Sequence, residues 1–79
     1  MFTVYSKENC PSCDNAKKYL TKLGKEYKTI MVTEFAIDDN EITKEEFVNK
    51  FPGIRTVPYI IGPSGEIYKN FNELIANVK

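Results

Sequence analysis

The chain contains no histidine and no tryptophan, and only two of its 79 residues are cysteine. A tetrahedral zinc site needs four ligands, mostly cysteine or histidine, so we expect no metal held by this chain alone. Lysine and arginine together number 11, as do aspartate and glutamate, so the net charge is zero. Binding driven by counterion release from nucleic acid needs a basic surface, so we expect no nucleic-acid partner.

Long hydrophobic runs are also lacking. No run approaches the roughly 18 apolar residues of a membrane span, and no charged segment precedes an apolar signal-like segment. Strand-like sequence already begins at Phe2. We therefore expect no membrane partner, no targeting segment and a location in the reducing cytoplasm. The length predicts one domain over residues 1–79, near the lower limit for a single core, and we expect a monomer.

The two cysteines are close together, in the run Cys10-Pro11-Ser12-Cys13. A strand-like segment from Phe2 to Ser6 precedes them, and an amphipathic pattern follows. A dithiol between a strand and a helix is typical of a redox site, because a helix N-terminus or a nearby cation lowers a thiol pKa from about 8.5. Three other readings stay open: a structural disulfide, half of a metal site completed from outside, and two inert thiols.

The periodicity predicts a helix from near Pro11 to Leu23 whose buried stripe includes Ala16 and Leu20. Cys13 lies three residues before Ala16 and should point inward with this stripe. Cys10 lies at the mouth of the helix and should face solvent. The pattern therefore predicts an exposed attacking thiol and a shielded resolving thiol.

The rest of the chain alternates strands and helices. Residues 26–32 read as a strand, residues 33–42 as a solvated acidic loop, and Thr43 with Glu46 as a capping box that starts a helix. Residues 59–61 and 66–68 read as a hairpin, and Asn70 with Glu73 as the cap of a third helix. We expect Phe47, Val48 and Phe51 to face the core. The order β-α-β-α-β-β-α predicts an α/β fold with a four-stranded mixed sheet flanked by three helices.

These residues resemble those of glutaredoxins, in the thioredoxin-fold superfamily. The resemblance rests on Val4-Tyr5-Ser6-Lys7, Cys10-Pro11-Ser12-Cys13, Thr56-Val57-Pro58 and the closing hairpin and helix. It implies a thioredoxin fold and a thiol–disulfide oxidoreductase that reduces protein or glutathione mixed disulfides with electrons from glutathione. Cys10 would be the nucleophile and Cys13 the resolving thiol. The small size also resembles short phage-encoded members, which donate hydrogen to ribonucleotide reductase.

The resemblance also implies a glutathione site. Lys7 would stabilise the Cys10 thiolate and bind a glutathione carboxylate, and the backbone of Val57, before a cis proline, would pair with the cysteinyl part. The residues implied in binding are Lys7, Pro11, Ser12, Thr56, Val57, Pro58, Asn72 and Glu73.

Two departures from the family pattern bear on this site. Ser12 stands where most dithiol members have tyrosine, and Lys69-Asn70 stands where a Gly-Gly pair usually lets the chain approach the γ-glutamyl end. The Lys69-Asn70 departure keeps open reduction by a thioredoxin reductase, and Ser12 keeps open a [2Fe–2S] cluster bound between two protomers through the first cysteine and glutathione. A redox-silent adaptor is a separate alternative.

Overall fold

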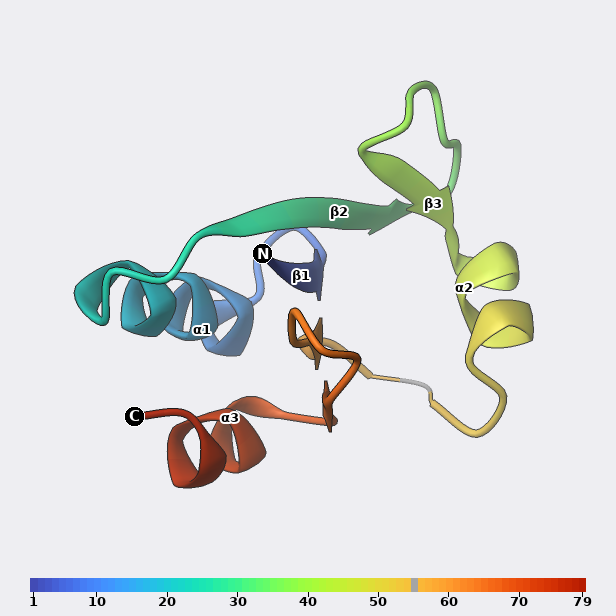
Figure 1. The fold of residues 1–79 in the computed structure, drawn as a ribbon. Helices are drawn as coiled ribbons and strands as arrows, with labels where there is room; N and C mark the ends of the chain where they lie inside the picture. Colours follow the sequence, from blue (N-terminus) through green and yellow to red (C-terminus); the bar gives the residue numbers. More distant parts are fainter. Residues whose placement is uncertain (55) are drawn as a thin grey trace.

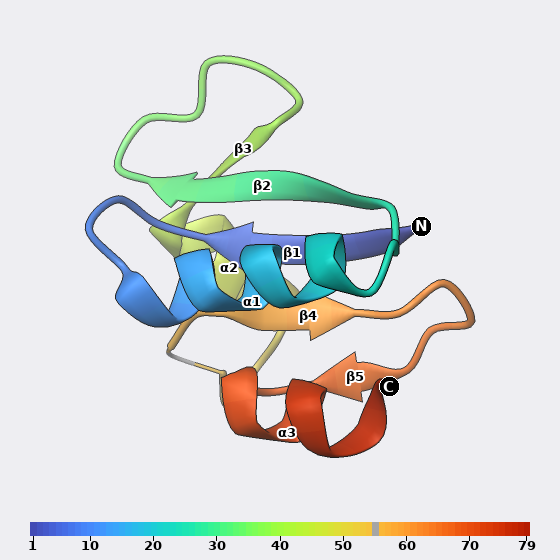
Figure 2. The ribbon, with the colours of Figure 1, turned by 90° about the vertical axis from the view of Figure 1, so that its left-hand side faces the viewer.

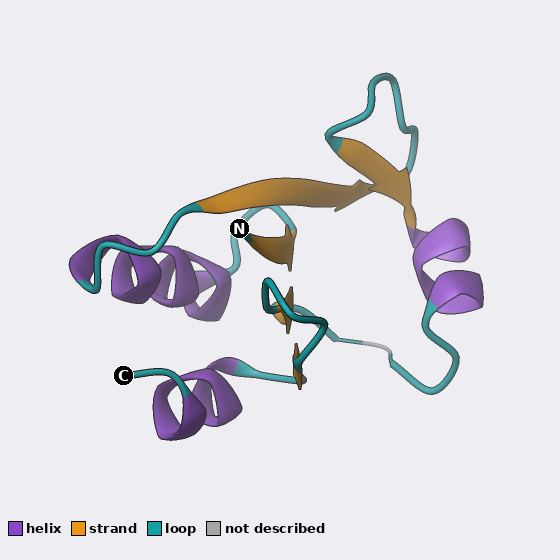
Figure 3. Cartoon of the chain, viewed as in Figure 1, coloured by secondary structure: helices purple, strands orange, loops and turns teal. Residues whose placement is uncertain are grey.

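The computed structural model describes residues 1–54 and 56–79 and contains five strands and three helices (Figures 1 and 3). In chain order these are β1 (Phe2–Ser6), α1 (Pro11–Lys22), β2 (Tyr27–Thr33), β3 (Glu41–Thr43), α2 (Lys44–Lys50), β4 (Tyr59–Ile61), β5 (Ile67–Tyr68) and α3 (Phe71–Asn77). In that part of the chain no helix combines the length and the apolar character needed to cross a membrane.

The strands form one mixed sheet in the order β3-β2-β1-β4-β5. β1 is parallel to β2 and antiparallel to β4, and β4 pairs with β5 as a hairpin. This is the predicted thioredoxin fold, but the predicted count of four strands was one too low. Residues 41–43, assigned to a solvated loop and a helix start, instead pair with residues 31–33 as a parallel edge strand. Three residues are too few for an alternating pattern to stand out from an acidic loop.

Helices cover both faces of the sheet (Figures 1 and 2). α1 and α3 pack on one face around a fully buried core that includes Val4, Leu20 and Leu74. α2 packs on the other face through an aromatic cluster of Tyr5, Phe47, Phe51 and Tyr59. The sheet is therefore buried on both sides around β1, the strand that leads to the cysteines.

The capping predictions for the two short helices are confirmed. The Thr43 hydroxyl accepts the Glu46 N–H at 3.1 Å and donates to the Glu46 carboxylate at 2.9 Å. Asn70 Oδ1 accepts the Glu73 N–H at 2.8 Å. The prediction that Val48 faces the core was wrong, because its side chain is 40% exposed and lines a cavity that also contacts Val32 and Cys10.

Candidate functional site

The chain reverses direction between β1 and α1, and this reversal places Cys10. Asn9 adopts the left-handed conformation with φ 55°, which asparagine tolerates better than most residues. Cys10 follows in extended conformation as the N-cap of α1, with Pro11 in the first turn. Pro11 suits this position because its missing N–H has no partner at a helix start. The Cys10 sulfur therefore lies at the N-terminus of a 12-residue helix.

Cys10 and Cys13 are joined by a disulfide bond, so the structure represents the oxidised form. The backbone N–H of Cys13 donates to the Cys10 Sγ across 3.2 Å. In the reduced form this N–H and the positive end of the helix dipole both favour a thiolate on Cys10. Of the two sulfurs, the Cys10 Sγ is therefore the one at the helix N-terminus, and the sequence pattern predicts the same residue as the attacking thiol.

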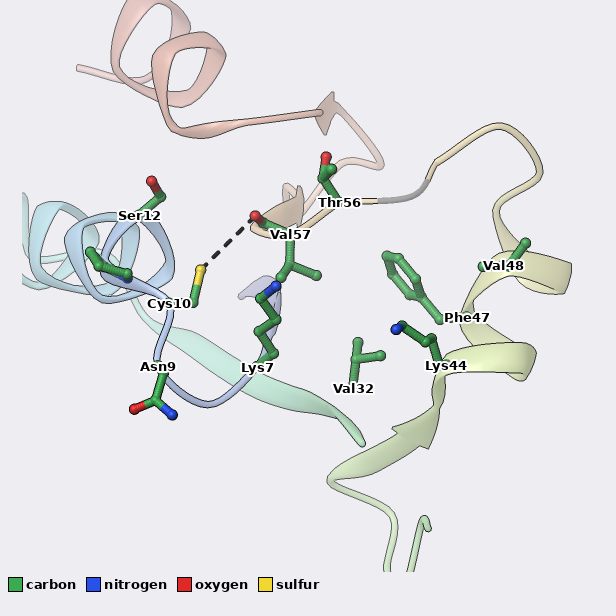
Figure 4. Close-up of a pocket in the computed structure, with 11 residues that line it drawn as sticks. Lys7, Asn9, Cys10, Ser12, Val32, Lys44, Phe47, Val48, Thr56 and Val57 are labelled. Carbon is green, nitrogen blue, oxygen red and sulfur yellow. Dashed lines mark hydrogen bonds between the residues drawn. The ribbon is translucent and has the colours of Figure 1, made fainter. Parts of the chain in front are cut away.

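The exposure of the two cysteines corrects one prediction. Cys10 is only 7% exposed, although it was expected to face solvent, and Cys13 is fully buried. The Cys10 sulfur lies 4.0 Å from the carbonyl oxygen of Val57, which helps to cover it (Figure 4). The predicted asymmetry remains, because Cys10 lines an open cavity and Cys13 does not.

This cavity has a volume of about 600 Å³ and lies between the β1–α1 turn, the end of β2, α2 and the segment before β4. Figure 4 shows Lys7 and Lys44 on opposite sides of it, with the apolar side chains of Val32 and Phe47 nearby. The described residues that line it are Lys7, Asn9, Cys10, Pro11, Ser12, Val32, Lys44, Phe47, Val48, Thr56 and Val57. This lining set contains two lysines and no carboxylate, so it suits an anionic ligand.

The structure brings together most of the residues implied in glutathione binding. Lys7, Pro11, Ser12, Thr56 and Val57 all line the cavity beside Cys10. The Val57–Pro58 peptide bond is cis, as the resemblance implies, and Pro58 itself is buried behind the lining.

The other two implied residues, Asn72 and Glu73, do not line this cavity. Asn72 is exposed on α3, and Glu73 serves the cap of that helix. The Glu73 carboxylate accepts the N–H of Lys69 at 3.2 Å, while its own N–H is held by Asn70. In this conformation the Glu73 carboxylate and N–H are therefore engaged within the chain.

Sequence reasoning missed five lining residues: Asn9, Val32, Lys44, Phe47 and Val48. Lys44 directly follows the α2 cap, and Phe47 and Val48 were assigned wholly to the core. The helical pattern did carry a signal, since Lys44, Phe47 and Val48 are spaced i, i+3, i+4 and so share one side of a helix. Which side faces the cysteines is set by the sheet order, which the pattern alone does not contain.

Comparison with known proteins identifies the family. A family model described as Glutaredoxin matches residues 2–62. The chain belongs to the glutaredoxin family. The match includes both cysteines and Thr56-Val57-Pro58, and it ends before α3.

Solved glutaredoxin structures share the fold. Wheat glutaredoxin is 28% identical to this chain, with a TM-score of 0.72. The match covers 95% of this chain and 66% of the wheat protein. A buckwheat glutaredoxin–glutathione complex is 25% identical with a TM-score of 0.71, at 95% coverage of this chain and 64% of that one. Glutaredoxin 1 from Francisella tularensis, complexed with cacodylate, has a TM-score of 0.77 at 23% identity, covering 96% and 88% of the two chains. No curated protein sequence matches the chain.

Proposed function

We propose that residues 1–79 form a dithiol oxidoreductase unit that reduces disulfides with electrons from glutathione. The observation that carries this proposal is the position of the Cys10 sulfur. It accepts the Cys13 N–H at a helix N-terminus and lines a cavity that two lysines flank. A sulfur in this position is stabilised as a thiolate, which is the form that attacks a disulfide. A purely structural disulfide would not require a ligand cavity beside it. Proposed substrates are protein disulfides, with ribonucleotide reductase as one candidate, and glutathione mixed disulfides in a reducing cytoplasm.

The reaction follows from the exposure of the two sulfurs. The Cys10 thiolate attacks a substrate disulfide, forms a mixed disulfide and releases one substrate thiolate. Cys13 then attacks the Cys10 Sγ, releases the second substrate thiolate and leaves the Cys10–Cys13 disulfide. One glutathione thiolate attacks Cys10 and displaces Cys13, and a second removes the first as glutathione disulfide. Cys10 takes every attack from outside, because Cys13 is fully buried.

The cavity suggests how glutathione is held. With its sulfur at Cys10, its backbone would pair with the polar groups of Val57, beside Thr56. A carboxylate of the same molecule would then lie between the amines of Lys7 and Lys44, because the described residues that line the cavity include no competing carboxylate. Charge-assisted hydrogen bonds of this kind are about twice as strong as neutral ones. Lys44 is an addition to the residues that the family resemblance implies.

The residues predicted to hold the γ-glutamyl end of glutathione support a second candidate, in which thioredoxin reductase supplies the electrons. Asn72 and Glu73 were predicted to hold this end, yet Glu73 already bonds to the N–H of Lys69. Asn70, in place of a glycine, bonds to the N–H of Glu73 and so occupies the start of α3. This closed arrangement keeps reduction by a thioredoxin reductase as the second candidate, with the same chemistry at Cys10.

A steady-state assay separates the two candidates. The protein is supplied with hydroxyethyl disulfide and NADPH, with either glutathione plus glutathione reductase or thioredoxin reductase alone. The proposal predicts turnover only in the first mixture, and no turnover for Cys10→Ser. Turnover only in the second mixture would establish the rival and refute glutathione dependence.

A further inference from the structure

Ser6 is the last residue of β1, and it is unusual among the polar residues of the chain. Within residues 1–54 and 56–79 it is the only polar or charged residue that is buried, with no exposed surface at all. Its hydroxyl makes no hydrogen bond to any described residue. A buried hydroxyl without a partner is unfavourable and needs an explanation, and a redox or catalytic role is one such explanation.

The strand register shows which side of the sheet Ser6 faces. Val4 pairs with Ile60, and both belong to the core cluster under α1 and α3. Side chains two residues apart on a strand point to the same face, so Ser6 faces α1 as Val4 does. Extending the register by one residue places Pro58 opposite Ser6.

The same cluster aligns α1 with the sheet. Ala16 and Leu20 of α1 pack with Val4 and Ile60, and Cys13 lies one helical turn before Ala16 on the same buried stripe. Figure 2 shows α1 crossing in front of β1, with the start of the helix at the end of the strand where Ser6 lies. Ser6 on the strand and Cys13 on the helix are both fully buried and therefore lie at the same end of one interface.

Cys13 gains a charge in this interface each time the disulfide opens. When a thiolate attacks the Cys10 Sγ, a new S–S bond forms on Cys10 and the old bond breaks. Its electron pair leaves with Cys13, which becomes a buried thiolate before it is protonated. An anion in an apolar site is costly unless a donor reaches it, and the Cys13 N–H already points at Cys10.

We propose that the Ser6 hydroxyl donates a hydrogen bond to the Cys13 sulfur when the disulfide opens. The Ser6 hydroxyl therefore lacks a partner while the disulfide is closed and gains one when the disulfide opens. This hydrogen bond would stabilise the Cys13 thiolate as it leaves, and it would also stabilise the reduced dithiol form at equilibrium. The inference rests on the proposed redox function, but its test needs no glutathione.

The test compares the native chain with Ser6→Ala and Ser6→Thr in dithiothreitol redox buffers. Dithiothreitol gives two electrons and two protons to the Cys10–Cys13 disulfide and becomes its own cyclic disulfide. Loss of one net hydrogen bond should shift this equilibrium about fivefold toward the protein disulfide in Ser6→Ala. Ser6→Thr keeps the hydroxyl and should stay near the native value. In a Cys13→Ala background, Ser6→Ala should leave the pH dependence of Cys10 alkylation unchanged.

Thermal unfolding of both redox forms supplies the second readout. Ser6→Ala removes an unsatisfied group from the oxidised form, so that form should melt at the same or a higher temperature, while the reduced form should melt lower. An unchanged dithiothreitol equilibrium, equal shifts in both redox forms, or an oxidised Ser6→Ala that fails to fold would each overturn the proposal. Failure of glutathione turnover alone would refute the proposed function and leave this equilibrium test intact.

Discussion

Replacing Lys44 by alanine should weaken glutathione use without disabling the thiol chemistry. Lys44 lines the cavity from the first turn of α2, whereas Cys10 lies on the opposite wall (Figure 4). Its amine can therefore bind a carboxylate of the ligand but has no contact with the reacting sulfur. We expect a higher KM for glutathione and an unchanged kcat at saturation, because only binding interactions common to ground and transition states are lost.

The size of the effect follows from the exposure of the two lysines. Both Lys7 and Lys44 are exposed, so water and salt screen their attraction for a carboxylate. Exposed ion pairs contribute about 0.2–1 kcal/mol each, and 1 kcal/mol corresponds to about a fivefold change in an equilibrium constant. Each alanine variant should raise the KM about 1.4- to fivefold. Lys7→Ala should also lower kcat, since Lys7 lies in the turn that carries Cys10.

The assay is the glutathione reductase-coupled reduction of hydroxyethyl disulfide at several salt concentrations. Lys22→Ala is the matched control, because Lys22 is exposed in the last turn of α1, about 16 Å along the helix from its first residue. Added salt should raise the native KM and should leave the KM of the double variant, Lys7→Ala with Lys44→Ala, almost unchanged. A double variant that keeps the native KM, or a Lys22→Ala variant that raises the KM equally, would show that the two lysines do not bind the glutathione carboxylate.

Three further outcomes test other parts of the structure. Cys13→Ser should lose activity on protein disulfides that need two thiols but keep activity on glutathionylated substrates; equal loss in both assays would argue against a glutathione site. Thr43→Ala removes two hydrogen bonds to Glu46 and should lower the free energy of unfolding by about 1 kcal/mol in urea denaturation, whereas no change would show that the cap is dispensable. Burial, and then the charge of Tyr5, raises the pKa of Tyr59 above its ordinary value of 10.0. The stability from neutral Tyr59 is therefore full below pH 10 and is lost as the pH rises further, so Tyr59→Phe should flatten this alkaline decline in pH-dependent denaturation.

Local chemistry made much of the fold predictable from the sequence. The caps at Thr43 and Asn70 mark helix starts because their side chains satisfy free N–H groups, and both stand in the structure as expected. The helix after Pro11 ends within a residue of its predicted end, since its apolar stripe and the glycine beyond it both act locally. The missed β3 owes its existence to pairing with β2, a contact that its own three residues do not encode.

The candidate site could be predicted only in part, because some of its residues come together through contacts between distant segments of the chain. Cys10 and Cys13 follow from their spacing, and Lys7 and Val57 came from a resemblance to a family. Lys44 and Val48 come from a helix on the other face of the sheet, so their approach to Cys10 depends on the tertiary arrangement. The exposure of Cys10 was overestimated because the segment around Val57, far along the chain, lies over its sulfur.

The most direct test of glutathione as the electron source is the reduction of the Cys10–Cys13 disulfide itself. The oxidised protein is incubated with glutathione, glutathione reductase and NADPH, or with thioredoxin reductase and NADPH, and is then alkylated with iodoacetamide and weighed by mass spectrometry. We expect glutathione to open the disulfide, so that both cysteines are alkylated, and thioredoxin reductase to leave it intact. A disulfide that survives glutathione and is opened only by thioredoxin reductase would contradict this expectation.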